Sequence, residues 1–185
     1  MPLSADRLVI LDRDGVINQD SDHYIKSLEE WIAYPASIAA IGELTRAGYT
    51  IAIATNQSGL GRGYFDEQTL TTMHDKLEGL VENVGGRIAR IAYCPHEPGD
   101  DCKCRKPLPG LLFQIQQALG LDTLEGSWMV GDSLRDLQAG EAAGSRPVLV
   151  KTGKGAATLE KKELPTGTKV FDDLAAFSRW LLGIE

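Results

Sequence analysis

The sequence lacks long apolar runs, an excess of basic residues, and cysteines outside one short stretch. No apolar run approaches the length of about 20 residues that a membrane-spanning helix needs, and the first residues lack the basic-then-apolar build of a signal peptide. The formal net charge of −7 opposes non-specific binding to nucleic acid or to anionic lipid. We therefore expect a cytoplasmic protein with no membrane and no nucleic-acid partner, in which any phosphorylated ligand must meet a local basic cluster.

The three cysteines of the chain fall close together and beside a histidine. They form the pattern C-x-H-x5-C-x-C over Cys94, His96, Cys102 and Cys104. Three thiolates and one imidazole are the ligand types and number that tetrahedral Zn²⁺ takes in a closed structural site. A surface loop with incidental cysteines, or one disulfide with a thiol left over, is the alternative, but an odd cysteine count cannot be fully paired. We therefore expect a structural zinc loop over residues 94–104.

Length and hydrophobic periodicity predict one α/β domain. At 185 residues with 43% hydrophobic composition, the chain is long enough for one well-buried domain and short for two, so we expect a single domain over residues 1–185. Apolar runs that indicate strands lie at 8–11, 51–54, 88–93, 128–130, 148–150 and, more weakly, near 170. Amphipathic stretches that indicate helices lie at 37–47, 66–84, 107–119, 133–143 and 172–182, with Gly48, Gly120 and Gly144 as C-caps. The alternation favours a Rossmann-like parallel sheet with helices on both faces.

Segment 153–167 contains no such periodicity. Its glycines, lysines and proline predict a long solvent-exposed connection whose charges belong to a solvated surface.

Polar residues follow the expected strands where each strand ends. In an open α/β sheet the ligand crevice lies beyond the carboxyl ends of the strands. Asp12 and Asp14 follow the first strand, and their carboxylates can converge because residues two apart face the same side of an extended chain. The second strand is followed by hydroxyl, amide and backbone N–H groups suited to phosphate oxygens, namely those of Thr55, Asn56, Gln57 and Ser58.

Two further strands bring more carboxylates and a basic pair. Asp132 and Asp136 follow the strand at 128–130, and Arg105 and Lys106 follow the cysteine loop. Carboxylates from two strands form a hard-oxygen site for Mg²⁺, which keeps several waters and accepts a phosphate oxygen. The same aspartates could be turn or helix-cap residues. The joint presence of the acidic cluster, the Thr-Asn turn and a lysine favours a functional site.

These residues resemble the four motifs of the haloacid dehalogenase (HAD) superfamily of phosphatases. The match runs in order over nearly the whole chain, through Asp12-x-Asp14-Gly15-Val16, Thr55-Asn56, Lys106 and Gly131-Asp132-x3-Asp136. The resemblance implies that Asp12 is the nucleophile that forms an aspartyl-phosphate. It also implies that Asp14 protonates the leaving alkoxide and then deprotonates the attacking water, while Thr55 and Lys106 bind the transferring phosphoryl group.

The resemblance also implies a magnesium centre. Mg²⁺ would be held by Asp12, the Asp14 backbone carbonyl and Asp132, with Asp136 orienting the cluster through Lys106 or a metal-bound water. The physical logic agrees, because a carboxylate is a poor nucleophile toward a phosphate dianion until a divalent ion and a lysine neutralise the phosphate oxygens.

Within the superfamily, the cysteine loop narrows the resemblance to heptose bisphosphate phosphatases and the neighbouring histidinol-phosphate phosphatases. The strings that carry it are Leu11-Asp-Arg-Asp-Gly-Val-Ile-Asn18, Thr55-Asn-Gln-Ser-Gly59 with Arg62-Gly63, and Cys94-Pro-His96 through Cys104-Arg-Lys-Pro107. It implies a HAD-type core without a cap domain and a small phosphorylated sugar as substrate.

The expected reaction is release of the 7-phosphate of heptose 1,7-bisphosphate, in the supply of nucleotide-activated heptose for lipopolysaccharide. Histidinol phosphate or another small phosphomonoester is the alternative substrate, and a non-enzymatic zinc-loop binding module is an alternative of another class. A monomer is expected. An uncapped site must select its substrate with loops, and the candidate contacts are Asp20, Tyr24, Arg62 and Arg105.

Overall fold

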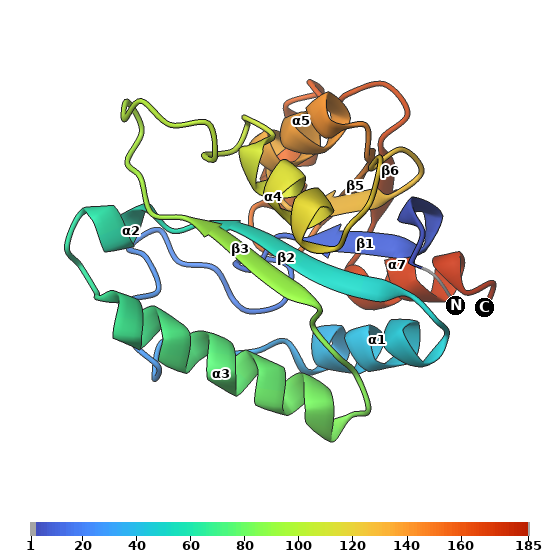
Figure 1. The fold of residues 1–185 in the computed structure, drawn as a ribbon, viewed down its shortest axis with the longest axis horizontal. Helices are drawn as coiled ribbons and strands as arrows, with labels where there is room; N and C mark the ends of the chain where they lie inside the picture. The colour runs from blue at the N-terminus through green and yellow to red at the C-terminus, as the bar shows by residue number, and fades with distance from the viewer. Residues whose placement is uncertain (1–2, 185) are drawn as a thin grey trace.

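The computed structural model describes residues 3–184, which form a six-stranded parallel sheet (Figure 1). The strands lie side by side in the order β3-β2-β1-β4-β5-β6, and every neighbouring pair is parallel. Their bounds are β1 Leu8–Leu11, β2 Thr50–Asn56, β3 Arg90–Cys94, β4 Trp128–Gly131, β5 Arg146–Val150 and β6 Lys169–Phe171. The strand order reverses between β1 and β4, and the carboxyl ends at such a reversal form the usual ligand crevice of an open α/β sheet.

Helices cover both faces of the sheet. A short 3₁₀ turn, Ala5–Arg7, precedes β1, and the helices are α1 Pro35–Arg46, α2 Ser58–Gly61, α3 Glu67–Asn83, α4 Gly110–Ala118, α5 Leu134–Ala143, α6 Gly155–Glu160 and α7 Leu174–Leu181. Figure 1 shows α1 and α3 on one face and α4 and α5 on the other. Along β1, Val9 and Leu11 pack with α1, α3 and α7, whereas Leu8 and Ile10 pack with α4 and α5. All four residues are therefore buried, as expected for a strand covered on both faces.

The helix ends follow from local chemistry. Asp66 precedes α3, and its carboxylate accepts a hydrogen bond from the Thr69 backbone N–H at 2.8 Å, which satisfies a free donor of the first turn. The three glycines predicted as C-caps all adopt positive φ, which residues with a Cβ adopt at a cost. The values are 93° at Gly48, 69° at Gly120 and 90° at Gly144.

The structure confirms the predicted parallel sheet and all of the predicted strands and helices, with shifted ends. The second strand continues through Asn56, so Thr55 and Asn56 lie within β2 and not after it. Within residues 3–184, no sheet is present besides the central one, which agrees with a core that carries no cap domain. Across the same residues, no helix combines the length and the apolar character needed to cross a membrane.

The prediction that segment 153–167 is only an exposed connection was wrong. It contains the helix α6, and the Thr158 hydroxyl of this helix is buried and donates to the Asp132 backbone carbonyl at 2.8 Å. The helix is too short to show an apolar period in the sequence. Its position against the loop after β4 makes the segment part of the candidate site.

Candidate active site

A cavity of about 230 Å³ lies at the carboxyl ends of β1, β2 and β4. Polar side chains dominate its lining, and nearly all of the residues predicted for the reaction centre contribute to it. Those residues are Asp12, Asp14, Asp20, Tyr24, Thr55, Asn56, Gln57, Ser58, Arg105, Lys106, Asp132 and Asp136. The fold thus gathers residues that are up to 124 positions apart in the chain, between Asp12 and Asp136.

Lys106 is the buried centre of the cavity floor. Only 1% of the residue is exposed, and its Nζ lies 3.0 Å from Asp12 Oδ1, 2.6 Å from Asp136 Oδ1 and 2.7 Å from the Ala54 carbonyl oxygen. Burial opposes the charge, but the Asp12 and Asp136 carboxylates outweigh this effect and raise the pKa of Lys106. The lysine is therefore a fixed cation beside the Asp12 carboxylate.

Asn56 holds the lysine in place. Its side-chain Nδ2 donates to the Lys106 carbonyl oxygen at 3.1 Å, and its Oδ1 accepts from the Lys106 backbone N–H at 3.0 Å. The end of β2 is thereby tied to the loop that carries the lysine, across 50 residues of sequence. These two bonds position Lys106, and the contact of Asn56 with phosphate stays a prediction.

Asp12, Asp132 and Asp136 offer carboxylate oxygens that all lie within 4.8 Å of one another. Burial and the neighbouring Asp136 raise the pKa of Asp12 well above its ordinary range, and burial followed by Asp136 raises that of Asp132 to about 7. One lysine cannot neutralise three buried carboxylates. The donor set and its excess negative charge fit a hard divalent cation such as Mg²⁺. The 2.6 Å contact between Lys106 Nζ and Asp136 Oδ1 fits the predicted role of Asp136 in orienting the cluster, and its carboxylate also lies among the potential metal ligands.

Asp14 faces a different environment from Asp12. Its Oδ1 accepts hydrogen bonds from Arg13 Nε at 2.8 Å and Asn18 Nδ2 at 2.9 Å, and its Oδ2 is 3.4 Å from Gln57 Nε2. Burial opposes ionisation, but the Arg13 guanidinium and these hydrogen bonds outweigh it and lower the pKa of Asp14. The Asp14 carboxylate is therefore held by its own hydrogen bonds and lies outside the group of three clustered carboxylates.

Thr55 and Gln57 line the wall between the two aspartates. Gln57 Nε2 donates to Thr55 Oγ1 at 2.9 Å as well as approaching Asp14. Gln57 and Ser58 are both largely buried, and Ser58 begins the short helix α2. The wall therefore presents hydroxyl and amide groups to the cavity on a rigid support.

Gly153 and Lys154, which follow β5, complete the site, and no motif or periodicity marked them in advance. Asp132 Oδ2 accepts a hydrogen bond from the Lys154 backbone N–H at 2.9 Å. Gly15 and Gly153 pack so closely against the Asp132 carboxylate that a Cβ on either would collide with it. Both also have positive φ, 86° and 57°. Two glycine backbones therefore fix the position of Asp132.

The predicted substrate contacts at the rim differ in position. Asp20, Tyr24 and Arg105 line the cavity, and Arg135 lies close enough to Arg105 to lower its pKa, after the larger effect of burial. Arg62 does not line the cavity. Its guanidinium is 3.2 Å from Glu97 and stacks over the Tyr24 ring at 5.9 Å. Arg62 as a substrate contact therefore stays a prediction.

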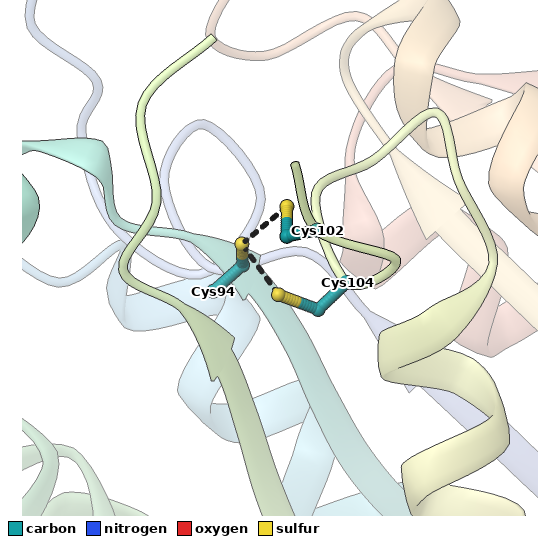
Figure 2. Close-up of side chains that lie close together, drawn as sticks. All are labelled: Cys94, Cys102 and Cys104. Carbon is teal, nitrogen blue, oxygen red and sulfur yellow. Dashed lines mark hydrogen bonds between the residues drawn. The ribbon is translucent and has the colours of Figure 1, made fainter. Parts of the chain in front are cut away.

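The three cysteines converge where β3 ends: Cys94 is its last residue, and Cys102 and Cys104 lie in the loop that follows, as Figure 2 shows. Cys94 Sγ lies 2.7 Å from Cys104 Sγ and 4.0 Å from Cys102 Sγ, and all three are free thiols. Burial and the neighbouring thiols raise the pKa of Cys104 to about 12. Burial also raises the pKa of Cys94, whereas hydrogen bonds from the Arg105 and Cys104 backbone outweigh burial and lower that of Cys102. A thiolate-binding ion such as Zn²⁺ would favour ionisation of all three thiols.

His96 does not join the group of metal-type ligand atoms that the three cysteines form. Its backbone carbonyl accepts a hydrogen bond from Arg105 Nη1 at 3.4 Å. His96 as the fourth zinc ligand therefore stays a prediction.

Comparison with known proteins places the chain among phosphatases. The HAD-hydrolase-like family model matches residues 103–177. A Pseudomonas aeruginosa protein named D-glycero-beta-D-manno-heptose-1,7-bisphosphate 7-phosphatase is 58% identical over 175 residues, which are 95% of this chain and 97% of that protein. A protein of the same name from Neisseria meningitidis is 53% identical over 178 residues, 95% of each chain.

Two solved structures of heptose bisphosphate phosphatases are also similar to this chain. The D,D-heptose 1,7-bisphosphate phosphatase of Bordetella bronchiseptica, complexed with magnesium and phosphate, superposes with a TM-score of 0.93 at 53% identity and covers 96% of this chain and 98% of its own. The corresponding phosphatase of Burkholderia thailandensis has a TM-score of 0.75 at 45% identity, with 95% and 98% coverage. The chain belongs to the D-glycero-beta-D-manno-heptose-1,7-bisphosphate 7-phosphatase family of HAD-like hydrolases.

Proposed function

We propose that the protein is a Mg²⁺-dependent phosphatase that releases the 7-phosphate of D-glycero-β-D-manno-heptose 1,7-bisphosphate and leaves the anomeric phosphate in place. The reaction would serve the synthesis of nucleotide-activated heptose for lipopolysaccharide. The observation that carries the proposal is the buried Lys106 between Asp12 and Asp136, beside Asp132, in a cavity at the strand ends. The relatives named for this substrate, and the magnesium and phosphate bound by one of them, support it.

Asp12 acts as the nucleophile. One of its carboxylate oxygens attacks the 7-phosphorus, the bond from phosphorus to the sugar oxygen breaks, and Asp14 gives that oxygen its proton. Lys106, 3.0 Å from Asp12, offsets the negative charge of the phosphoryl oxygens, and the Thr55 hydroxyl binds one of them. In the second half of the reaction, Asp14 takes a proton from water, which attacks the phosphorus and frees Asp12 and inorganic phosphate.

Mg²⁺, when bound, neutralises phosphate oxygens as a Lewis acid. Asp12, Asp132 and the Asp14 backbone carbonyl would hold it, and Asp136 is close enough to contribute directly or through a water. Asp14 is ionised in the free protein because Arg13 stabilises its carboxylate. Approach of the negatively charged phosphate raises the proton affinity of Asp14, which takes up from solvent the proton that it then donates to the leaving oxygen.

The cavity accepts the primary phosphate while the sugar ring stays at the rim. A space of about 230 Å³ suits a phosphoryl group with a short carbon chain, and its mouth is bordered by Asp20, Tyr24 and Arg105. The primary 7-phosphate stands on an extended arm of the sugar and can reach Asp12. The anomeric phosphate is attached to the ring itself, so the ring keeps it at the rim.

Regiochemistry is the most direct test of the proposed function. During turnover of the β anomer, ³¹P NMR should show the primary ester resonance disappearing while the anomeric resonance survives. Parallel kcat/KM values on the α anomer and on histidinol phosphate should be lower. Loss of the anomeric phosphate first, or faster hydrolysis of histidinol phosphate, would contradict the heptose assignment and leave the phosphatase assignment standing.

We propose that Zn²⁺ organises the loop that carries Arg105 and Lys106. Elemental analysis after desalting should give one zinc per chain, and Cys102→Ser should lower zinc content and activity together. The melting temperature should change little in comparison with these losses, because the three thiols lie together at the end of β3 and hold only the local loop. Ser21→Ala provides a control without a thiol change, with zinc content expected as in the wild type. A zinc-free Cys102→Ser protein with full activity would refute the organising role.

We further propose that residues 1–185 form one HAD-like domain that acts as a monomer in the cytoplasm. The cytoplasmic location is supported by the three free thiols, because thiols that serve as zinc ligands require a reducing compartment.

A further inference from the structure

Arg13 stands between the two aspartates in the sequence, and its side chain is fully buried beneath Asp14. Its Nε donates to Asp14 Oδ1 at 2.8 Å, while its Nη1 lies 3.2 Å from His74 Nε2 and 3.8 Å from Met73 Sδ, both in α3. Its Nη2 has no hydrogen-bond partner among residues 3–184. A buried guanidinium is costly unless it is paired. The Asp14 carboxylate is therefore the group of opposite charge that compensates the buried guanidinium of Arg13.

His74 is the partner that fixes the far side of this guanidinium. It is buried in α3 with 8% of its surface exposed, and burial followed by the neighbouring Arg13 lowers its pKa to about 3. The imidazole is therefore neutral, and its Nε2 accepts the hydrogen bond from Arg13 while the proton resides on Nδ1. Because the guanidinium is a planar fork, holding Nη1 also sets the direction of Nε.

The contacts of Asp14 show what this direction controls. Both close hydrogen bonds, from Arg13 and Asn18, converge on Oδ1, whereas Oδ2 meets only the longer 3.4 Å approach of Gln57. Oδ1 is thus anchored, and Oδ2 is the oxygen left to exchange a proton with substrate. A turn of the Arg13 fork would rotate the carboxylate and move Oδ2.

We propose that His74 is a positioning residue that, through Arg13, aims the Asp14 carboxylate at the leaving oxygen of the substrate. The inference rests on the proposed function, since it needs Asp14 to act as the acid. It extends the site by one helix, because α3 contributes no residue to the cavity lining. His74 thereby serves catalysis without touching substrate.

The test compares kcat/KM for two phosphate esters in His74→Phe. For p-nitrophenyl phosphate, kcat/KM covers only the steps up to departure of nitrophenolate, which leaves without a proton. For heptose 1,7-bisphosphate the departing alkoxide needs the proton of Asp14. For the heptose ester we expect kcat/KM to fall about tenfold or more, which is a part of the roughly 10²- to 10⁴-fold rate increase that acid–base assistance supplies. For the nitrophenyl ester we expect kcat/KM to stay within about twofold of the wild type.

His74→Gln is the matched control, because its side-chain oxygen can accept the hydrogen bond from Arg13; it should restore most of the heptose activity. If His74→Phe fails to fold by circular dichroism, His74→Leu removes the same acceptor with a smaller side chain and should show the same selective loss. Equal losses on both esters, or no loss on either, would overturn the inference.

Asp14→Asn separates this inference from the proposed function. A selective loss of heptose activity in Asp14→Asn without one in His74→Phe would overturn only the role of His74. Unchanged heptose activity in Asp14→Asn would overturn the acid–base role of Asp14, and the inference with it.

Discussion

Asp12→Asn should abolish hydrolysis of heptose 1,7-bisphosphate while the protein remains folded. The loss should exceed the roughly 10²- to 10⁴-fold effect of removing an acid–base group, because the amide cannot take the place of the carboxylate that bonds to phosphorus. Phosphate release measures the activity. Mass spectrometry of acid-quenched enzyme should detect an added phosphoryl group on the wild type during turnover and none on the variant.

Asp12→Asn should not lower the stability of the folded protein. Asp12 is one of three clustered carboxylates, and burial and Asp136 raise its pKa, so ionised Asp12 is disfavoured in the folded protein without metal. Asn removes that charge at nearly constant volume, and Lys106 keeps its ion pair with Asp136. In metal-free buffer we expect a melting temperature equal to or above that of the wild type.

Asp122→Asn is the matched control, because Asp122 is exposed and remote from the cavity lining. It should behave as wild type in both assays. Turnover by Asp12→Asn within tenfold of the wild type would contradict an aspartyl-phosphate mechanism.

The convergence of the carboxylates could be predicted from sequence because it depends on a general property of parallel sheets. Asp12 and Asp132 each follow a buried strand, and parallel strands present their carboxyl ends at one edge. Hydrophobic periodicity alone does not reveal which strands are adjacent. The resemblance to the HAD motifs indicated that these strands lie together. The structure then places β1 beside β4 and brings the two side chains together.

Contacts that depend on the packing of remote segments could not be predicted. Lys154 supports Asp132 only because the chain after β5 folds back over the loop after β4, and its sequence resembles any polar connection. His74 follows the helical period of α3 as an ordinary polar residue, and nothing local marks Arg13 as its partner 61 positions away. Asn56 was recognised as a site residue, but its two bonds to the Lys106 backbone require the end of β2 to lie beside the segment that follows the cysteine loop.

Lys106→Met should cause the largest combined loss of stability and activity. The substitution keeps much of the side-chain volume but leaves Asp12 and Asp136 buried without their shared cation, at distances that were 3.0 and 2.6 Å. Removing one partner of a buried ion pair typically costs about 3–5 kcal/mol. We expect the free energy of unfolding to fall by about this amount, as measured by urea denaturation in EDTA at pH 7.

Lys103→Met is the matched control, since Lys103 lies in the same loop and is exposed; its unfolding midpoint should equal that of the wild type. Asp136→Asn added to Lys106→Met should restore part of the lost stability, because it removes one of the two uncompensated carboxylates. Activity should stay lost in the double variant, since neither change returns a cation to the phosphoryl oxygens. If the second substitution lowers stability further, Lys106 does not stabilise the fold by neutralising Asp136, and the charge balance inferred for the cavity floor is wrong.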